Sequence, residues 1–297
     1  MESNMQDLLA VVVTYNRKEL LSGCIERLLD QSFPCDVLII DNGSTDGTRE
    51  SIEKLINDKL ILYKNTGTNL GGAGGFNYGL KVAVEQGYKY VWIMDDDTYP
   101  QKDALEKLHC ASEALNDNYG FLSSVALWKD GTLCNMNIQR VSPYKKIEGL
   151  PSEDKKVEMA TFVSFFLKTQ TIKEVGLPIK EFFIWSDDFE YSRRISMKYP
   201  CYLISDSIVE HYMKTNQKVG IEAESEDRLW RYEYMYRNEV YVYRREGLKG
   251  YLYLFMRFAL HNIRIITKAH ENKGVKLKVI WKSFIKGFSF KPAIEHV

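Results

Sequence analysis

Hydrophobic residues in the first part of the chain fall into short continuous runs separated by longer amphipathic stretches. Residues 8–13 read Leu-Leu-Ala-Val-Val-Val, which is typical of a strand covered on both faces. The predicted strands are 8–13, 36–40, 60–63, 90–94 and 121–126, and the predicted helices are 18–30, 46–57, 75–86 and 102–116. This alternation predicts an α/β fold with a mostly parallel sheet and right-handed crossovers.

The pattern changes twice along the rest of the chain. Beyond residue 126 the alternation loosens, and antiparallel strands are expected within 157–167. From about residue 224 onward the chain reads as helices in which tyrosine, tryptophan and arginine are interleaved. We therefore expect two parts, an α/β domain at 1–226 and a basic, aromatic-rich helical region at 227–297.

Composition narrows the class of protein. With 45% hydrophobic and 27% charged residues, the 297-residue chain falls within the range of ordinary soluble proteins. Its five cysteines form no CxxC pair, which argues against a disulfide framework and a zinc knuckle. No uncharged apolar run approaches the roughly 20 residues that span a bilayer, and the first residues lack a secretion signal pattern. We expect a cytoplasmic protein.

The net charge of zero hides an asymmetry between the two parts. Residues 228–297 hold 15 Lys/Arg and five Asp/Glu, a net charge of +10, which leaves −10 on the first 227 residues. Because the cations alternate with aromatics at helical spacing, we expect an interfacial helix on anionic lipid at the inner face of the plasma membrane. A dimerisation helix that builds a homo-oligomer, or a lid helix, is the alternative. The acidic remainder argues against nucleic-acid binding.

Three aspartates, Asp95, Asp96 and Asp97, directly follow the apolar run 90–94. Ligands of an open α/β sheet bind outside the carboxyl ends of its strands. Like charges crowded there are unfavourable unless a cation neutralises them, and Mg²⁺ or Mn²⁺ prefers carboxylate and phosphate oxygens. Asp95 and Asp97 are the expected metal-binding pair, with an acidic surface turn as the alternative.

A second acidic cluster lies in 182–191, Phe-Phe-Ile-Trp-Ser-Asp-Asp-Phe-Glu-Tyr. The aromatic side chains around Asp187 and Asp188 can exclude water, and burial raises the pKa of a carboxyl group and makes it a better base. If a helix begins near Ser186, both aspartates occupy its first turn. There, stabilisation of the helix N-terminus is an alternative role for them.

Two loops at predicted strand-to-helix junctions have the composition of nucleotide-binding segments. Residues 41–48 mix glycines with small hydroxyl side chains, and Asp41 can accept hydrogen bonds from a base or ribose. Residues 69–77 carry four glycines, which permit close approach to a pyrophosphate or sugar, with Asn69 and Gly72 as candidate contacts. Their spacing differs from GxGxxG, which argues against a dinucleotide site. His211 can offer a neutral imidazole to the same metal, with a structural role as the alternative.

Taken in order, these segments resemble those of inverting family 2 glycosyltransferases. The resemblance rests on Val-Val-Val-Thr-Tyr-Asn-Arg at 11–17, on 41–48, on 95–97 and on Asp-Asp-Phe-Glu at 187–190, and covers roughly residues 8–215. It implies the GT-A fold, with helices on both faces of a mostly parallel sheet, and a nucleotide-sugar donor. The implied roles are a nucleotide site lined by Thr14, Asn16, Arg17 and Asp41, contacts of Asp95, Asp96 and Asp97 with ribose, diphosphate and metal, and Asp188 as catalytic base.

Within the family, segments 69–77, 95–97 and 185–190 and the later His211 are similar to galactofuranosyl- and rhamnosyltransferases. This implies His211 as a metal ligand and UDP-galactofuranose as donor, with dTDP-rhamnose as the alternative. It also implies a glycan or lipid-linked acceptor in bacterial cell-surface polysaccharide synthesis. Trp185 and Asp187 are assigned to the acceptor or sugar pocket, although those relatives often have tryptophan immediately before the paired aspartates, whereas Ser186 intervenes here.

Two other classes of protein are compatible with parts of this pattern. A non-catalytic nucleotide-sugar-binding subunit would share the loops, but it would not need both acidic clusters. A nucleotidyltransferase also places aspartates and a metal at strand ends. It normally needs a basic triphosphate-binding loop near the N-terminus, where this chain offers only Arg17 and Lys18.

Overall fold

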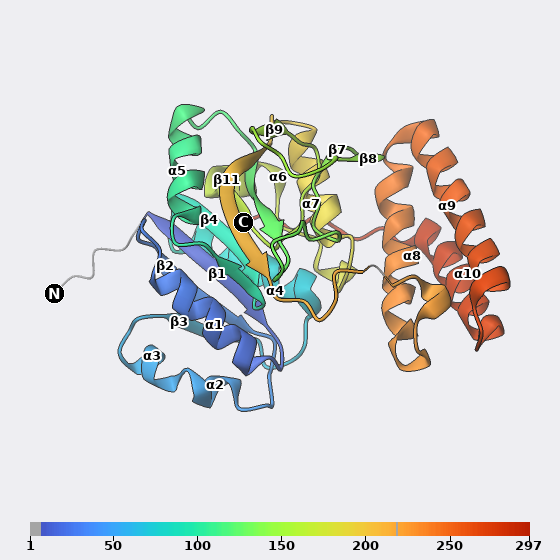
Figure 1. Ribbon diagram of the computed structural model, residues 1–297, viewed down its shortest axis with the longest axis horizontal. Coiled ribbons are helices and arrows are strands. Elements are labelled where there is room, and N and C mark those ends of the chain that lie inside the picture. Colours follow the sequence, from blue (N-terminus) through green and yellow to red (C-terminus); the bar gives the residue numbers. More distant parts are fainter. Residues whose placement is uncertain (1–6, 218) are drawn as a thin grey trace.

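The computed structural model describes residues 7–217 and 219–297, and its centre is a nine-stranded mixed sheet (Figure 1). The strand order is β3-β2-β1-β4-β10-β6-β11-β5, with β9 paired to β11. Strands β1 to β4 are parallel to one another. The strands of this half are β1 Leu8–Thr14, β2 Asp36–Asp41, β3 Leu62–Asn65 and β4 Tyr90–Asp95. The predicted parallel α/β half is therefore confirmed.

The other half of the sheet is mixed. Strand β10 runs antiparallel to both β4 and β6, β11 is parallel to β6, and β5 is antiparallel to β11. The antiparallel strand that was expected within 157–167 is thus β10, at the end of that segment. The strands of this half are β5 Thr98–Pro100, β6 Phe121–Leu127, β9 Lys155–Lys156, β10 Phe165–Lys168 and β11 Tyr202–His211, and a separate ribbon pairs β7 Arg140–Ser142 with β8 Lys145–Lys146.

Two apolar layers cover the sheet because alternate residues of each strand point to opposite faces. In β1, Leu9, Val11 and Val13 enter one layer, while Leu8, Ala10 and Val12 enter the other. The first layer is completed by α4 Gly71–Glu85, α6 Thr169–Val175 and α7 Asp187–Ser196, and the second by α1 Lys18–Leu29 and α5 Ala104–Ala114.

Three predicted element boundaries differ from the structure. The helix expected at 46–57 is divided into α2 Thr48–Ser51 and α3 Glu53–Asn57, because the backbone turns at Ile52 and its side chain enters the core. The strand expected at 60–63 lies at Leu62–Asn65. The helix expected from residue 75 starts at Gly71, so the glycine-rich segment forms the first turns of α4 instead of a loop before it.

Three long helices follow the sheet domain, α8 Leu229–Arg244, α9 Gly247–Lys268 and α10 Lys273–Ser289. Figure 1 places α8 next to the sheet domain, with α9 and α10 on its far side. Ion pairs join α7 to the end of α8 and the residues after it: Arg193 to Glu246 at 2.7 Å and Glu190 to Arg245 at 3.4 Å. The division at 226/227 stays a prediction, although the helical region does begin there. Among the described residues, no helix is long and apolar enough to span a bilayer.

Candidate active site

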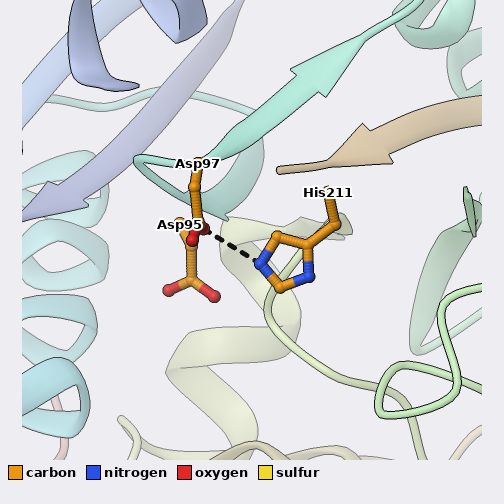
Figure 2. Close-up of side chains that lie close together, drawn as sticks. All are labelled: Asp95, Asp97 and His211. Atoms are coloured by element: carbon orange, nitrogen blue, oxygen red, sulfur yellow. Dashed lines mark hydrogen bonds and ion pairs between the residues drawn. The ribbon is translucent and has the colours of Figure 1, made fainter. Parts of the chain in front are cut away.

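Two separate strands bring a carboxylate pair and an imidazole together. Asp95 ends β4, Asp97 lies in the turn that leads to β5, and His211 ends β11, opposite β5. Figure 2 shows the three side chains pointing toward one another. His211 Nε2 lies 2.9 Å from Asp97 Oδ1, and one potential ligand atom from each residue lies within 4.8 Å of the others. The structure thus assembles the three residues predicted to bind metal.

The imidazole of His211 is held from its other side. Its Nδ1 lies 2.9 Å from Asn137 Oδ1 and 3.8 Å from Cys134 Sγ. A proton on Nδ1 that is donated to Asn137 leaves Nε2 directed at Asp97, which is the orientation that a metal-binding histidine needs. Burial on its own lowers the pKa of His211, but the hydrogen bond and charge of Asp97 outweigh burial and raise this pKa to about 10.

Arg17 neutralises part of the acidic cluster. Its Nη1 lies 2.8 Å from Asp97 Oδ2 and 3.2 Å from Asp96 Oδ1, while the guanidinium is half-exposed. The second oxygen of Asp96 accepts a hydrogen bond of 2.7 Å from the Thr14 hydroxyl. Thr14 and Arg17, two residues predicted to bind the nucleotide, therefore both contact a third, Asp96, just after the end of β4. Arg17 has an exposed side from which it can reach a diphosphate.

The second acidic cluster lies within electrostatic range of the first. Asp187 and Asp188 begin α7, in the first turn as the sequence predicted. Burial and the charge of Asp95 raise the pKa of Asp188 to about 7, against the opposing effect of Arg140. Burial and the charge of Asp97 raise the pKa of Asp95 to about 7 as well. The charge of Asp95 thus contributes to the raised pKa of Asp188, so the two clusters lie within electrostatic range of each other.

The neighbours of Asp188 define its surroundings. Burial and the charge of Asp188 raise the pKa of Asp187 to about 8. The backbone N–H of Phe189 donates to Asp188 Oδ1 at 2.7 Å. Arg140 stacks over the Phe189 ring at 4.8 Å, and its buried Nε has no hydrogen-bond partner among the described residues. A buried cation with an unused donor next to a carboxylate can bind a substrate oxygen. Nothing in the sequence pattern had indicated Arg140.

The loop before Asp188 is strained. Phe183, Trp185 and Ser186 all have φ between 63° and 67°, a region that costs non-glycine residues about 1–3 kcal/mol each. The strain is offset by Asn238, a fully buried residue of α8. Its Nδ2 donates hydrogen bonds to the carbonyl oxygens of Phe182 at 3.0 Å, Ile184 at 3.3 Å and Trp185 at 2.9 Å. The helical region therefore fixes the backbone that positions Asp188.

Replacing Asn238 by alanine is expected to lower kcat by about 10- to 100-fold while leaving nucleotide affinity unchanged. Loss of the three hydrogen bonds releases the loop, and a displacement of about 1 Å can cost roughly 10² in rate. Asn262→Ala is the matched control, because Asn262 binds Trp281 within the helical region and makes no contact with the loop. Steady-state kinetics and calorimetric titration with nucleotide check this. Equal kcat values for the two variants would exclude a positioning role for Asn238.

The segments predicted to hold the base and ribose lie at the neighbouring strand end. Asp41, at the end of β2, accepts from the Tyr63 hydroxyl at 2.6 Å and from the Ser44 N–H at 2.8 Å. Asn16 Oδ1 accepts from the Thr45 N–H at 2.7 Å, so the 14–17 and 41–48 segments are joined. Asn69 is exposed and accepts from the Gly71 N–H at 2.8 Å. Their contacts with a nucleotide stay predictions.

The glycine-rich segment is explained mainly by packing. An added Cβ at Gly71, where φ is +73°, would lie 2.1 Å from the Phe183 carbonyl oxygen, and one at Gly75 would lie 2.5 Å from a Val13 methyl group. Gly72 has no heavy atom within 4 Å of that position, so open space lies beside it, and its contact with a ligand stays a prediction. Gly71 thus lets the start of α4 meet the strained loop.

The first turns of α8 contribute two further features. Trp185 packs edge-on against Tyr232 at 5.1 Å in an apolar cluster of the helical region, so its predicted stacking on a sugar stays a prediction. Burial and the positive charges of Arg228 and Arg17 lower the pKa of Arg231, and its buried Nε has no partner among the described residues. The charge of Arg17 thus acts on Arg231, a cation of the helical region.

This mixed sheet, with aspartates directly after β4, is the GT-A fold of nucleotide-sugar glycosyltransferases. The chain belongs to glycosyl transferase family 2, whose family model matches residues 9–175. It is similar to the galactofuranosyltransferase GlfT1 of Mycobacterium tuberculosis, with 26% identity over 270 residues that cover 83% of this chain and 85% of that protein.

Solved structures agree on the fold. The chain resembles S. aureus TarS with a TM-score of 0.55 and 17% identity, covering 96% of this chain and 44% of that chain. The 1–349 fragment of TarS has been solved with UDP. The chain also resembles the mannosyltransferase PcManGT from Pyrobaculum calidifontis in complex with GDP-Man and Mn²⁺, with a TM-score of 0.57 and 15% identity, covering 97% of this chain and 77% of that chain. The predicted fold class and family are confirmed.

Proposed function

We propose that this glycosyltransferase is a metal-dependent, inverting enzyme that transfers galactofuranose from UDP-galactofuranose to a hydroxyl group of a glycan or lipid-linked acceptor. The feature that supports the reaction type is the pair of acidic clusters at the end of β4 and the start of α7, which lie within electrostatic range of each other. The observation that supports the donor is the similarity to GlfT1 across most of both chains. The proposed setting is the cytoplasmic side of bacterial cell-surface polysaccharide synthesis.

Asp188 is the proposed general base. Its carboxylate accepts the proton of the acceptor hydroxyl while that oxygen forms a bond to the anomeric carbon of the donor. The bond from the anomeric carbon to the diphosphate oxygen breaks on the opposite side, and the electron pair leaves with the nucleoside diphosphate. Because attack and departure occur on opposite sides of one carbon, the anomeric configuration is inverted.

Cationic groups of the chain balance the charge of the leaving diphosphate. Arg17 already bridges Asp96 and Asp97 and has an exposed side. The buried Nε of Arg231 has no hydrogen-bond partner among the described residues. Donors that are fixed before charge develops stabilise a transition state efficiently, because no reorganisation is needed during the reaction. We assign both arginines to diphosphate binding.

Asp95, Asp97 and His211 would hold a divalent ion. Two carboxylates suit Mn²⁺ and Mg²⁺, and the imidazole, which binds transition metals well, favours Mn²⁺. A bound ion would stabilise the negative charge that grows on the departing diphosphate. Asn137 would orient the imidazole, as partners behind metal-binding histidines do.

Release of nucleoside diphosphate from a panel of nucleotide sugars, with and without chelator, tests this proposal. We expect metal-dependent release from UDP-galactofuranose above that from UDP-galactopyranose, UDP-glucose and GDP-mannose. Preference for dTDP-rhamnose would leave the reaction type intact and replace the donor. Tight binding of nucleotide sugars without release, in the presence of acceptor glycans and metal, would instead favour a non-catalytic binding subunit.

A further inference from the structure

Helix α9 exposes a continuous apolar stripe to solvent. Large side chains recur at three- and four-residue spacing on the side of the helix that faces away from α8. The most exposed are Leu248, Leu252, Phe255, Met256, Ile263 and Ile266, at 50% to 77% of their accessible surface. A surface helix normally turns such a stripe inward, and an apolar patch of this extent marks an interaction site.

Helix α10 extends the stripe into a face. Trp281, Ile285 and Phe288 are exposed at spacings of four and three residues. Phe288 stacks on Phe255 of α9 at 6.5 Å between ring centroids, and Trp281 packs against Phe258 at 4.9 Å. The exposed side chains of the two helices therefore adjoin. We call the α9 stripe together with these three residues of α10 the α9–α10 face.

The charges that accompany this face are all positive. Neither α9 nor α10 contains an aspartate or glutamate. Lys278, Lys282 and Lys286 are exposed on α10, interleaved with Trp281 and Ile285. Within the described residues no ion pair involves any of these three lysines, whereas Arg257, on the inner side of α9, is paired with Glu239 at 2.6 Å. The three lysines on the outer side therefore have no acidic partner in the described part of the chain and are left for an external one.

We propose that the α9–α10 face docks on an anionic lipid bilayer, with both helices lying in the plane of the interface. Apolar side chains would enter the acyl boundary while the lysines meet lipid phosphates, the combination that defines interfacial helices. Tryptophan is favoured at that depth. A second copy of the chain fits less well, because its face would bring a second set of unpaired lysines against the first. Docking would hold the active site near lipid-linked acceptors. This advantage rests on the proposed function, but the docking proposal does not depend on that function.

Flotation of the full-length protein with vesicles tests the face. Vesicles of phosphatidylcholine alone and of phosphatidylcholine with phosphatidylglycerol separate the apolar from the electrostatic contribution. The apolar variant is Leu252→Gln/Ile263→Gln/Ile266→Gln, and the charge variant is Lys278→Gln/Lys282→Gln/Lys286→Gln. The matched control is Leu60→Gln/Leu150→Gln/Met197→Gln, which removes equally exposed apolar side chains from the sheet domain.

We expect the wild type and the matched control to float with anionic vesicles, and the apolar and charge variants to lose partitioning by about tenfold or more. High salt should weaken binding of the wild type. Donor hydrolysis in solution, measured on the same samples, should be equal in all four proteins, so a failure of the catalytic proposal is seen separately. Wild type that stays with the dense fraction, or an apolar variant that floats as well as wild type, overturns the proposal. If the wild type does not float but forms a dimer, and the apolar substitutions dissociate that dimer, the proposal is also overturned. The face would then be assigned to a second copy of the chain.

Discussion

Asp188→Asn is expected to lower kcat by about 10²- to 10⁴-fold, the usual contribution of a general base, while the affinity for the nucleotide sugar changes little. The amide has nearly the shape of the carboxylate and can still accept the hydrogen bond from the Phe189 N–H, but it cannot take a proton from an acceptor hydroxyl. Single-turnover transfer assays together with calorimetric titration of the donor measure the two effects separately.

The pH dependence of kcat tests the role of Asp188 as the base. Because burial and Asp95 raise the pKa of Asp188 to about 7, the ionised base becomes more abundant as pH rises through that value, and kcat should rise with it. A metal ion on Asp95 would shift the rise to lower pH by neutralising that charge. Asp188→Asn should lack the rise. Unchanged turnover in this variant, or a rise that persists in it, would remove Asp188 from the proton transfer.

Asp97→Asn is expected to abolish metal-dependent turnover and to reduce the affinity for Mn²⁺ by at least about 100-fold. Substitution of a residue that only supports a metal ligand typically reduces metal affinity by roughly 10- to 100-fold, and Asp97 is a proposed ligand itself. Asp97 is central because it contacts His211 through one oxygen and Arg17 through the other. Asp30→Asn is a suitable control, because it removes an exposed carboxylate that pairs only with Lys102. Calorimetry with MnCl₂ on the folded proteins measures the affinities without any substrate.

Metal binding should also release a proton. The pKa of His211 is raised to about 10 by its contact with Asp97, so the imidazole is protonated at neutral pH, and it must lose that proton to bind a metal. Mn²⁺ affinity should therefore fall as pH is lowered, and the binding heat should depend on the ionisation enthalpy of the buffer. Asp97→Asn that binds Mn²⁺ as tightly as Asp30→Asn would refute the assignment of the metal site.

The parts of the site that follow strand ends could be predicted from the sequence. Apolar runs located β1, β2 and β4, and the carboxyl ends of parallel strands meet at one edge of a sheet. Asp41 and Asp95 were therefore expected at this edge, whereas the resemblance to family 2 implied Thr14 there, and the three residues end these strands. His211 was a weaker expectation because a lone histidine has no periodic pattern, and its approach to Asp97 depends on the pairing of β5 with β11.

The supporting residues could not be predicted for a physical reason. Asn137 lies outside regular structure and Arg140 begins the three-residue strand β7, which is too short to show a periodicity that indicates burial. Their neighbours His211 and Asp188 are tens of residues away in sequence. Asn238 lies 53 to 56 residues after the carbonyl groups that it binds, on a helix whose interleaved aromatics and arginines predicted lipid or oligomer contacts. The glycines of 69–77 were expected to permit close approach of a pyrophosphate or sugar, whereas Gly71 and Gly75 serve backbone and helix–sheet packing.

The helical region thus has two sides with different physical character. Its inner side, through Asn238, holds the loop before Asp188, and its outer side exposes the α9–α10 face. Removal of residues after 226 would uncover Ile221 and Trp185, which pack against apolar side chains of that region. Variants with single or few substitutions are therefore better probes of this region than truncation.

The anomeric configuration of the first glycosidic bond formed tests the central claim most directly. Proton NMR of the product, recorded early in a reaction with the donor that gives turnover, distinguishes the two anomers. A single in-line displacement assisted by Asp188 predicts the configuration opposite to that of the donor. A product that keeps the donor configuration would contradict the account, because retention requires a different arrangement of nucleophile and leaving group.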